Sequence, residues 1–173
     1  TLLFNTMEAV QLNANRRNGN LRLYEFGNCY FYDEAARDAE KPLSAYSEQY
    51  RLAIAVTGAA VPQSWNAKPQ ASSFFTLRAV AEKLLRRFGL DIYALKCEPL
   101  QSDLFGEALT MALNGRELLQ MGVVAPRIRR AFDLKQEVYY LEMNFDALVK
   151  STRKHRIAFE ELSKFPEVKR DLA

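Results

Sequence analysis

Asn114 and Gly115 separate two apolar runs, 109–113 and 118–124, and this pair constrains the fold more than any other feature of the chain. Asn and Gly tolerate the positive φ angles of a tight two-residue turn, so the pair predicts a β-hairpin. Two adjacent antiparallel strands require a larger sheet to pack in, because an isolated hairpin is marginally stable.

Other segments have the patterns of strands. Residues 52–56 are continuously apolar, as in a strand buried on both faces. Residues 138–143 alternate in polarity, which predicts a half-buried strand, and 92–97 reads as a further strand. Residues 21–32 are aromatic and extended, but we expect a break and a hairpin at Gly27.

Helices are predicted between these strands, and together they indicate an α+β fold: a mainly antiparallel sheet flanked by helices. The central helix starts at Ser72 or Ser73, whose hydroxyl can cap it, and stops at Gly89. The other predicted helices are 2–12, a short basic one from Pro126 to Phe132, and a last one capped by Asn144 or Asp146.

Two loops are candidates for contacts with another molecule. Residues 33–48 are charged and contain Pro42, and we expect this long loop to order against a partner. Trp65 lies in a proline-flanked loop, where it is either a core plug or an interface anchor.

Composition limits the class of protein. The 173 residues are 49 % hydrophobic, which suits one domain, and the net charge of +3 excludes a strongly basic nucleic-acid binder. Cys29 and Cys97 are outside any C-x-x-C spacing, which fits a reducing cytosol, so a cytoplasmic protein is expected. No apolar run is long enough for a membrane span. The chain starts at Thr1, and we expect it to be a piece of a longer protein.

The search for chemistry assigns no catalytic, cofactor-binding or metal-binding residue. His155, the only histidine, lies in a basic stretch and is expected at the surface, and no glycine-rich phosphate loop is present. Four acidic residues are interpreted as solubilising charge: Glu107, Glu117, Glu160 and Glu161. Basic clusters pair with surface acids or bind RNA phosphates, and the RNA contact is assigned to Arg127, Arg129 and Arg130.

Four blocks of the sequence occur in an order typical of one family. They are LYEFGNCYF at 23–31, SFFTLR at 73–78, the run from Gly122 through Pro126 to 142, and SKFPEVKRDLA at 163–173. In this order they resemble the β chain of bacterial phenylalanine-tRNA synthetase. The chain departs from the family at Ala125, where a histidine is usual, and at 103–112, so no role is carried to either place.

The resemblance implies a class II synthetase-like domain at 1–162 that is not catalytic, followed by a linker at 163–173 towards a C-terminal anticodon-binding-like domain. A working class II domain brings a glycine-rich strand and an arginine to ATP, but residues 140–146 contain neither. The fold therefore keeps its shape without the groups that stabilise charge during adenylation.

The same resemblance implies the partners. The whole enzyme, an α2β2 assembly, would join phenylalanine to its tRNA with ATP and magnesium, and this segment would bind the α subunit. We expect the first helix to expose Leu3, Met7 and Val10 to that subunit. Two alternatives remain: an RNA-binding module that uses the arginine clusters, and an enzyme with an unrecognised pocket.

Overall fold

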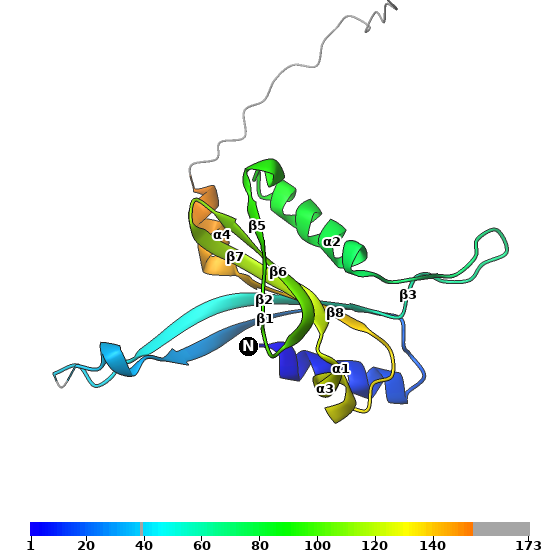
Figure 1. Ribbon diagram of the computed structural model, residues 1–173, viewed down its shortest axis with the longest axis horizontal. Coiled ribbons are helices and arrows are strands. Elements are labelled where there is room, and N and C mark those ends of the chain that lie inside the picture. Colours follow the sequence, from blue (N-terminus) through cyan, green and yellow to red (C-terminus); the bar gives the residue numbers. More distant parts are fainter. Residues whose placement is uncertain (39, 154–173) are drawn as a thin grey trace, which may run out of the picture.

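The computed structural model describes residues 1–38 and 40–153 (Figure 1). The predicted domain boundary after 162, His155, Glu160 and Glu161 lie outside the described residues.

One antiparallel sheet forms the centre of the molecule, as predicted for an α+β fold. Its order is β1-β2-β8-β7-β6-β5, and every neighbouring pair is antiparallel. The strands are β1 (Leu21–Tyr32), β2 (Tyr46–Thr57), β5 (Lys96–Pro99), β6 (Phe105–Leu113), β7 (Arg116–Val124) and β8 (Val138–Asn144). A separate small ribbon joins β3 (Ala59–Val61) and β4 (Gln70–Ala71).

Helices cover both faces of this sheet, so the molecule has three layers (Figure 1). On one face lie α1 (Leu3–Asn15) and α3 (Pro126–Ala131); on the other lie α2 (Phe74–Arg87) and α4 (Phe145–Thr152). Each face has its own apolar core. Because β8 lies between the two cores, Val138 to Met143 are all buried, and the prediction of a half-buried strand was wrong.

The break predicted at Gly27 is absent. β1 runs without interruption through Gly27, which pairs with Arg51 of β2. Glycine is needed here for space, since a Cβ atom at this position would lie 2.8 Å from Cδ2 of Leu2, at the start of α1. Its smallness lets α1 pack against the strand.

The local turn and cap signals were mostly correct. Asn114 and Gly115 have φ angles of 51° and 76° and join β6 to β7, as predicted. Ser73 caps α2 in a capping box with Thr76, and Asn144 caps α4. The strand predicted at 92–97 was wrong in its first half: Ile92–Ala94 form a 3₁₀ turn, and β5 starts at Lys96.

Two arms project from the layered body in Figure 1. The first is the far half of the β1–β2 hairpin, with a short 3₁₀ turn, Glu34–Ala36, near its tip. Its second strand starts at Tyr46, so the predicted loop 33–48 is shorter than expected. The second arm is the β3–β4 ribbon with its loop at 62–69.

Candidate protein interface

Six aromatic side chains form one exposed surface on the β1–β2 hairpin. Strand alternation places the four from β1 on one side, and pairing of Tyr46 with Tyr32 and of Tyr50 with Asn28 adds the two from β2. Their exposed fractions range from 40 % to 75 %. We call this surface the aromatic face; it consists of Tyr24, Phe26, Tyr30, Tyr32, Tyr46 and Tyr50.

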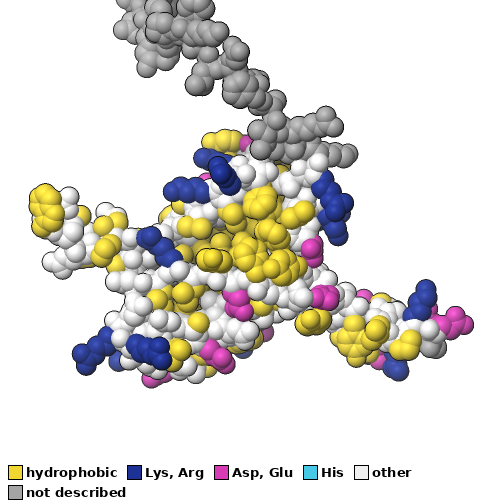
Figure 2. Space-filling model, turned by 180° about the vertical axis from the view of Figure 1, so that it is seen from behind, with side chains coloured by type: hydrophobic (Ala, Val, Ile, Leu, Met, Phe, Trp, Pro, Cys, Tyr) yellow, Lys and Arg dark blue, Asp and Glu magenta, His cyan; other side chains and the backbone are white. Residues whose placement is uncertain are grey.

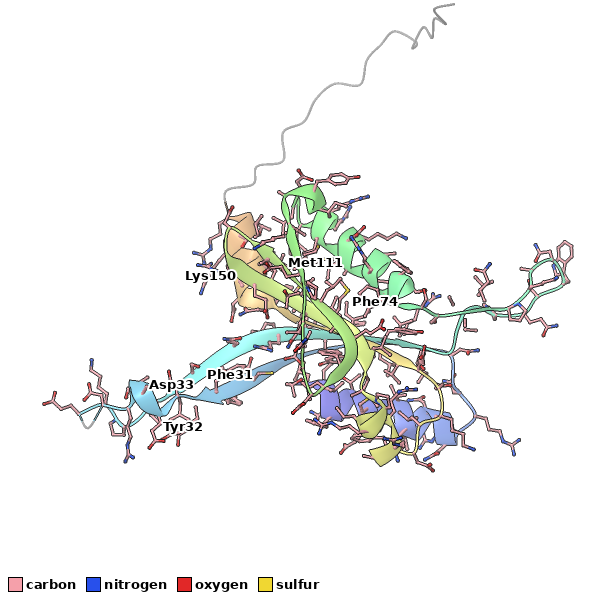
Figure 3. All side chains as sticks on the ribbon, in the orientation of Figure 1. Phe31, Tyr32, Asp33, Phe74, Met111 and Lys150 are labelled. Atoms are coloured by element: carbon pink, nitrogen blue, oxygen red, sulfur yellow. The ribbon has the colours of Figure 1, made fainter. Side chains whose placement is uncertain are left out.

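The aromatic face continues the core that α2 and α4 cover. Tyr24 pairs with Ile54 and Phe26 pairs with Leu52, and both partners belong to that core. The strands extend beyond the helices, so the same face becomes uncovered; Figure 3 shows Tyr32 at the far end of β1. An interior-like surface of this kind, left open to water, is typical of protein interfaces.

The rings are held in fixed arrangements. Phe26 stacks on Tyr50 with centroids 5.7 Å apart, and Phe145 of α4 meets Phe26 edge-on at 5.1 Å. Tyr32 and Tyr46 lie 5.2 Å apart near the tip. A partner would therefore meet side chains that have already lost much of their rotamer freedom, which lowers the entropic cost of binding.

An apolar groove opens where the hairpin enters the body. Its volume is about 340 Å³. Figure 2 shows apolar side chains gathered in the middle of this side of the molecule and along the β1–β2 arm. Between β1, β2 and α2, the groove is lined by Arg22, Leu23, Tyr24, Phe26, Leu52, Ile54, Val56, Val80 and Leu84.

The predicted interface on the first helix does not have the exposure it requires. Leu3, Met7 and Val10 are each 0 % exposed and pack in the core between α1 and the sheet. The apolar stripe of the helix was identified correctly, but the chain's own sheet covers it. Burial of these side chains therefore stabilises the fold and leaves none of them to bind a second subunit.

Trp65 is 96 % exposed in the loop of the β3–β4 arm, so its interpretation as a core plug was wrong. The base of the arm is fixed by a hydrogen bond of 2.7 Å from Nη2 of Arg22 to the carbonyl oxygen of Ala60. The role of Trp65 as an interface anchor stays a prediction.

A buried carboxylate, that of Glu142, lies within residues 140–146, the segment that contains neither the glycines nor the arginine of a working class II domain. Oε2 of Glu142 accepts hydrogen bonds from the Tyr140 hydroxyl at 2.7 Å, the Leu2 N–H at 3.1 Å and the Thr1 hydroxyl. Oε1 accepts one from Nη1 of Arg51, with which Glu142 forms an ion pair. We call these groups the Glu142 cluster.

Charge and burial act in opposite directions on this cluster. Burial alone would raise the pKa of Glu142, but hydrogen bonds from Thr1, Tyr140 and Arg51, together with the Arg51 charge, lower it below its usual value. Burial and the neighbouring carboxylate raise the pKa of the Tyr140 hydroxyl. The carboxylate also lies at the N-terminus of α1, where negative charge is favourable. Glu142 is thus a structural anion that fixes α1 to the sheet.

This environment does not fit ATP. Side chains from both cores fill the two faces of β8, and the Glu142 carboxylate would repel a phosphate. Among residues 1–38 and 40–153, no three His, Cys, Asp or Glu side chains come together as metal ligands would. In the same residues, no helix is long and apolar enough to cross a membrane.

The three arginines assigned to RNA contact lie on α3, and Arg129 and Arg130 line one pocket. The Arg127 guanidinium donates to the carbonyl oxygen of Asp103 at 2.9 Å. Arg129 is half-buried and donates to the carbonyl oxygen of Gln136, whereas Arg130 is exposed. The contact of these arginines with RNA stays a prediction. The guanidinium of Arg127 is already bound to the neighbouring loop. Cys29 is a buried free thiol, and Cys97 is exposed.

Comparison with known proteins gives the same fold. A pyrrolysyl tRNA synthetase from Desulfitobacterium hafniense superposes with a TM-score of 0.61 at 15 % identity, covering 87 % of this chain and 48 % of that one. The fold is therefore that of class II synthetases. At this identity the likeness shows the fold alone.

Sequence comparison is more specific. The chain is 44 % identical to the phenylalanine–tRNA ligase beta subunit of Bacteroides thetaiotaomicron and 36 % identical to that of Porphyromonas gingivalis, over its whole length. It spans about a fifth of these relatives, 21 % of each. Residues 1–145 match the family model described as the phenylalanyl tRNA synthetase beta chain CLM domain. The chain belongs to the family of phenylalanyl tRNA synthetase beta chain CLM domains.

Proposed function

We propose that this domain is a non-catalytic structural module of a phenylalanine–tRNA ligase β subunit, and that it supports assembly with the α subunit through the aromatic face. The whole α2β2 enzyme would charge tRNA with phenylalanine in the cytoplasm, using ATP and magnesium. The relatives' name supports the ligase as the context. The exposed aromatic face is the observation that carries the assembly role.

Energetics favour a covered aromatic face. Burying an aromatic side chain from water contributes about 1.5 to 3 kcal/mol, and aromatic residues are enriched among the residues that dominate binding. Six of them on two paired strands are far more than scattered surface apolar residues explain. The proposal of a non-catalytic role is supported by Glu142, whose two oxygens are both engaged within the fold.

Co-purification with the α subunit of the same organism tests this proposal. Tyr24, Tyr30 and Tyr46 are replaced together by Ser, because each is more than half exposed and contributes little to the core. We expect the unchanged domain to form a complex by light scattering that persists at high salt, since apolar contacts are not screened. We expect the triple variant to bind at least tenfold more weakly.

A matched control replaces exposed aromatic side chains elsewhere. Phe75 and Tyr93 are 72 % and 88 % exposed and lie off the aromatic face, so Phe75→Ser with Tyr93→Ser is expected to leave assembly unchanged. Equal complexes from the triple variant and from the unchanged domain would refute the assembly role of the aromatic face.

A further inference from the structure

Three basic side chains converge beside the turn between β6 and β7, although the sequence separates them widely. Arg116 opens β7, while Lys150 and Arg153 lie at the end of α4. They line a pocket of about 420 Å³ together with Leu113, Asn114 and Ser151, and within residues 1–38 and 40–153 no acidic residue lines it. Lys150 is labelled in Figure 3, and in Figure 2 Lys and Arg side chains gather on the side where α4 lies.

Strand pairing explains how Arg116 reaches α4. Arg116 pairs with Leu113, which packs in the core beneath α2 and α4, so both point to the same face of the sheet. The neighbouring Glu117 pairs with Ala112 and points to the opposite face. The nearest acid in the sequence is therefore directed away from the pocket.

Stabilisation of the α4 C-terminus accounts for only part of this arrangement. Cations near a helix C-terminus are favourable, which suits Lys150 and Arg153. However, the Ser151 and Thr152 hydroxyls already donate to the carbonyl oxygens of Ala147 and Val149. Arg116 belongs to another element, and its charge adds repulsion to the other two.

Partners within the described part of the chain do not offset this repulsion. Of the ion pairs found among residues 1–38 and 40–153, none includes Arg116, Lys150 or Arg153. All three side chains are exposed. A pocket with three positive charges and no acid is suited to a ligand that carries negative charge on a small, oxygen-rich group.

We propose that this pocket binds a backbone phosphate of RNA. Guanidinium and ammonium groups are the usual donors to phosphate oxygens, and Asn114 adds a polar neighbour. The described part of the chain gives the pocket no aromatic lining on which a base could stack, so we expect recognition of the backbone, without base specificity. This site is independent of the proposed assembly role.

Fluorescence anisotropy with a labelled RNA hairpin tests the proposal on the full chain. The variant replaces Arg116, Lys150 and Arg153 by Gln. For this variant we expect at least a tenfold loss of affinity at about 50 mM salt, and a slope of log affinity against log salt that is smaller by about 1. Because all three side chains are exposed, the unfolding temperature should not change, and circular dichroism checks this.

The control removes the same charge from another surface. Lys83, Arg86 and Arg87 are exposed on α2, and their joint replacement by Gln should leave most of the affinity. Equal losses in the two variants would overturn the site, because only total charge would then matter. Tyr24→Ser with Tyr30→Ser and Tyr46→Ser should bind RNA normally, which separates this result from the assembly test.

Inorganic phosphate distinguishes the source of the phosphate group. It is titrated into the unchanged chain while the Lys150 side-chain NMR signal is followed. Tight RNA binding that millimolar phosphate displaces only weakly supports an RNA backbone ligand. Phosphate binding with no RNA binding would overturn the RNA assignment and make the pocket one for small phosphates.

Discussion

Replacing Glu142 with Gln should destabilise the domain by about 2 to 3 kcal/mol. The change keeps the shape of the side chain but removes the charge that pairs with Arg51, and an amide N–H₂ would face the guanidinium. Removing one partner of a buried ion pair costs about 3 to 5 kcal/mol. The Arg51 side chain is 17 % exposed and also donates to Gln49, so part of that cost is recovered by water and by this second partner.

Urea unfolding followed by circular dichroism measures this difference at neutral pH. The pH dependence gives a second, independent test. The pKa of Glu142 is lowered in the folded state, so the carboxylate contributes stability above about pH 4.5, the value of the unfolded chain. That contribution is lost as the pH falls through the folded-state pKa. The difference in the free energy of unfolding between the unchanged domain and Glu142→Gln should therefore become smaller as the pH drops below 4.5.

A double-mutant cycle with Arg51→Met isolates the ion pair. If the two groups act together, the loss in the double variant is smaller than the sum of the single losses by at least 1 kcal/mol. Additive losses would refute the coupling of Glu142 to Arg51, and a loss below about 1 kcal/mol for Glu142→Gln alone would refute the assignment of Glu142 as the anion that fixes α1 to the sheet.

Further predictions concern packing, capping and exposure. Leu3→Asp with Met7→Asp should unfold the isolated domain, because two charges would enter the core; retained cooperative unfolding in calorimetry would contradict their burial. Gly27→Ala should cost about 1 kcal/mol in urea unfolding, since its Cβ meets the flexible end of Leu2, and a stabilising effect would contradict the close approach. Asn144→Ala should lower the free energy of unfolding by about 1 kcal/mol, because α4 loses its N-terminal cap. Asn114→Ala is a separate test, of the turn between β6 and β7. Trp65→Ser should leave the unfolding temperature unchanged, and the fluorescence of Trp65, the single tryptophan, should be that of a water-exposed indole; a blue-shifted emission would show that it is buried.

Local signals in the sequence predicted the elements well. The Asn114–Gly115 turn and the caps at Ser73 and Asn144 depend on neighbouring residues alone, so a single sequence contains the information. The break at Gly27 was wrong because the need for glycine comes from Leu2, which only the folded chain brings to that strand. Likewise, nothing local shows that helices cover both faces of β8.

The surface was harder to predict than the fold. Helical spacing correctly identified Leu3, Met7 and Val10 as apolar, but periodicity does not tell which surface covers a stripe. Large aromatic side chains at alternate positions are normally expected in a core, so the aromatic face gave no sign of its exposure. The pocket of Arg116 and Lys150 depends on strand pairing, which a list of basic clusters along the chain does not reveal.

The position of β8 determines the order in which this domain can be completed. β8 lies between β2 and β7, yet it is the last strand of the described sheet to be synthesised. Until it is inserted, β2 and β7 each present an unpaired edge, and the contact between Leu2 and Glu142, 140 residues apart, cannot form. Contacts this distant in the chain slow folding. During synthesis β2 and β7 therefore keep exposed edges, with which other chains can pair, until β8 has been made. Insertion of β8 covers both edges at once.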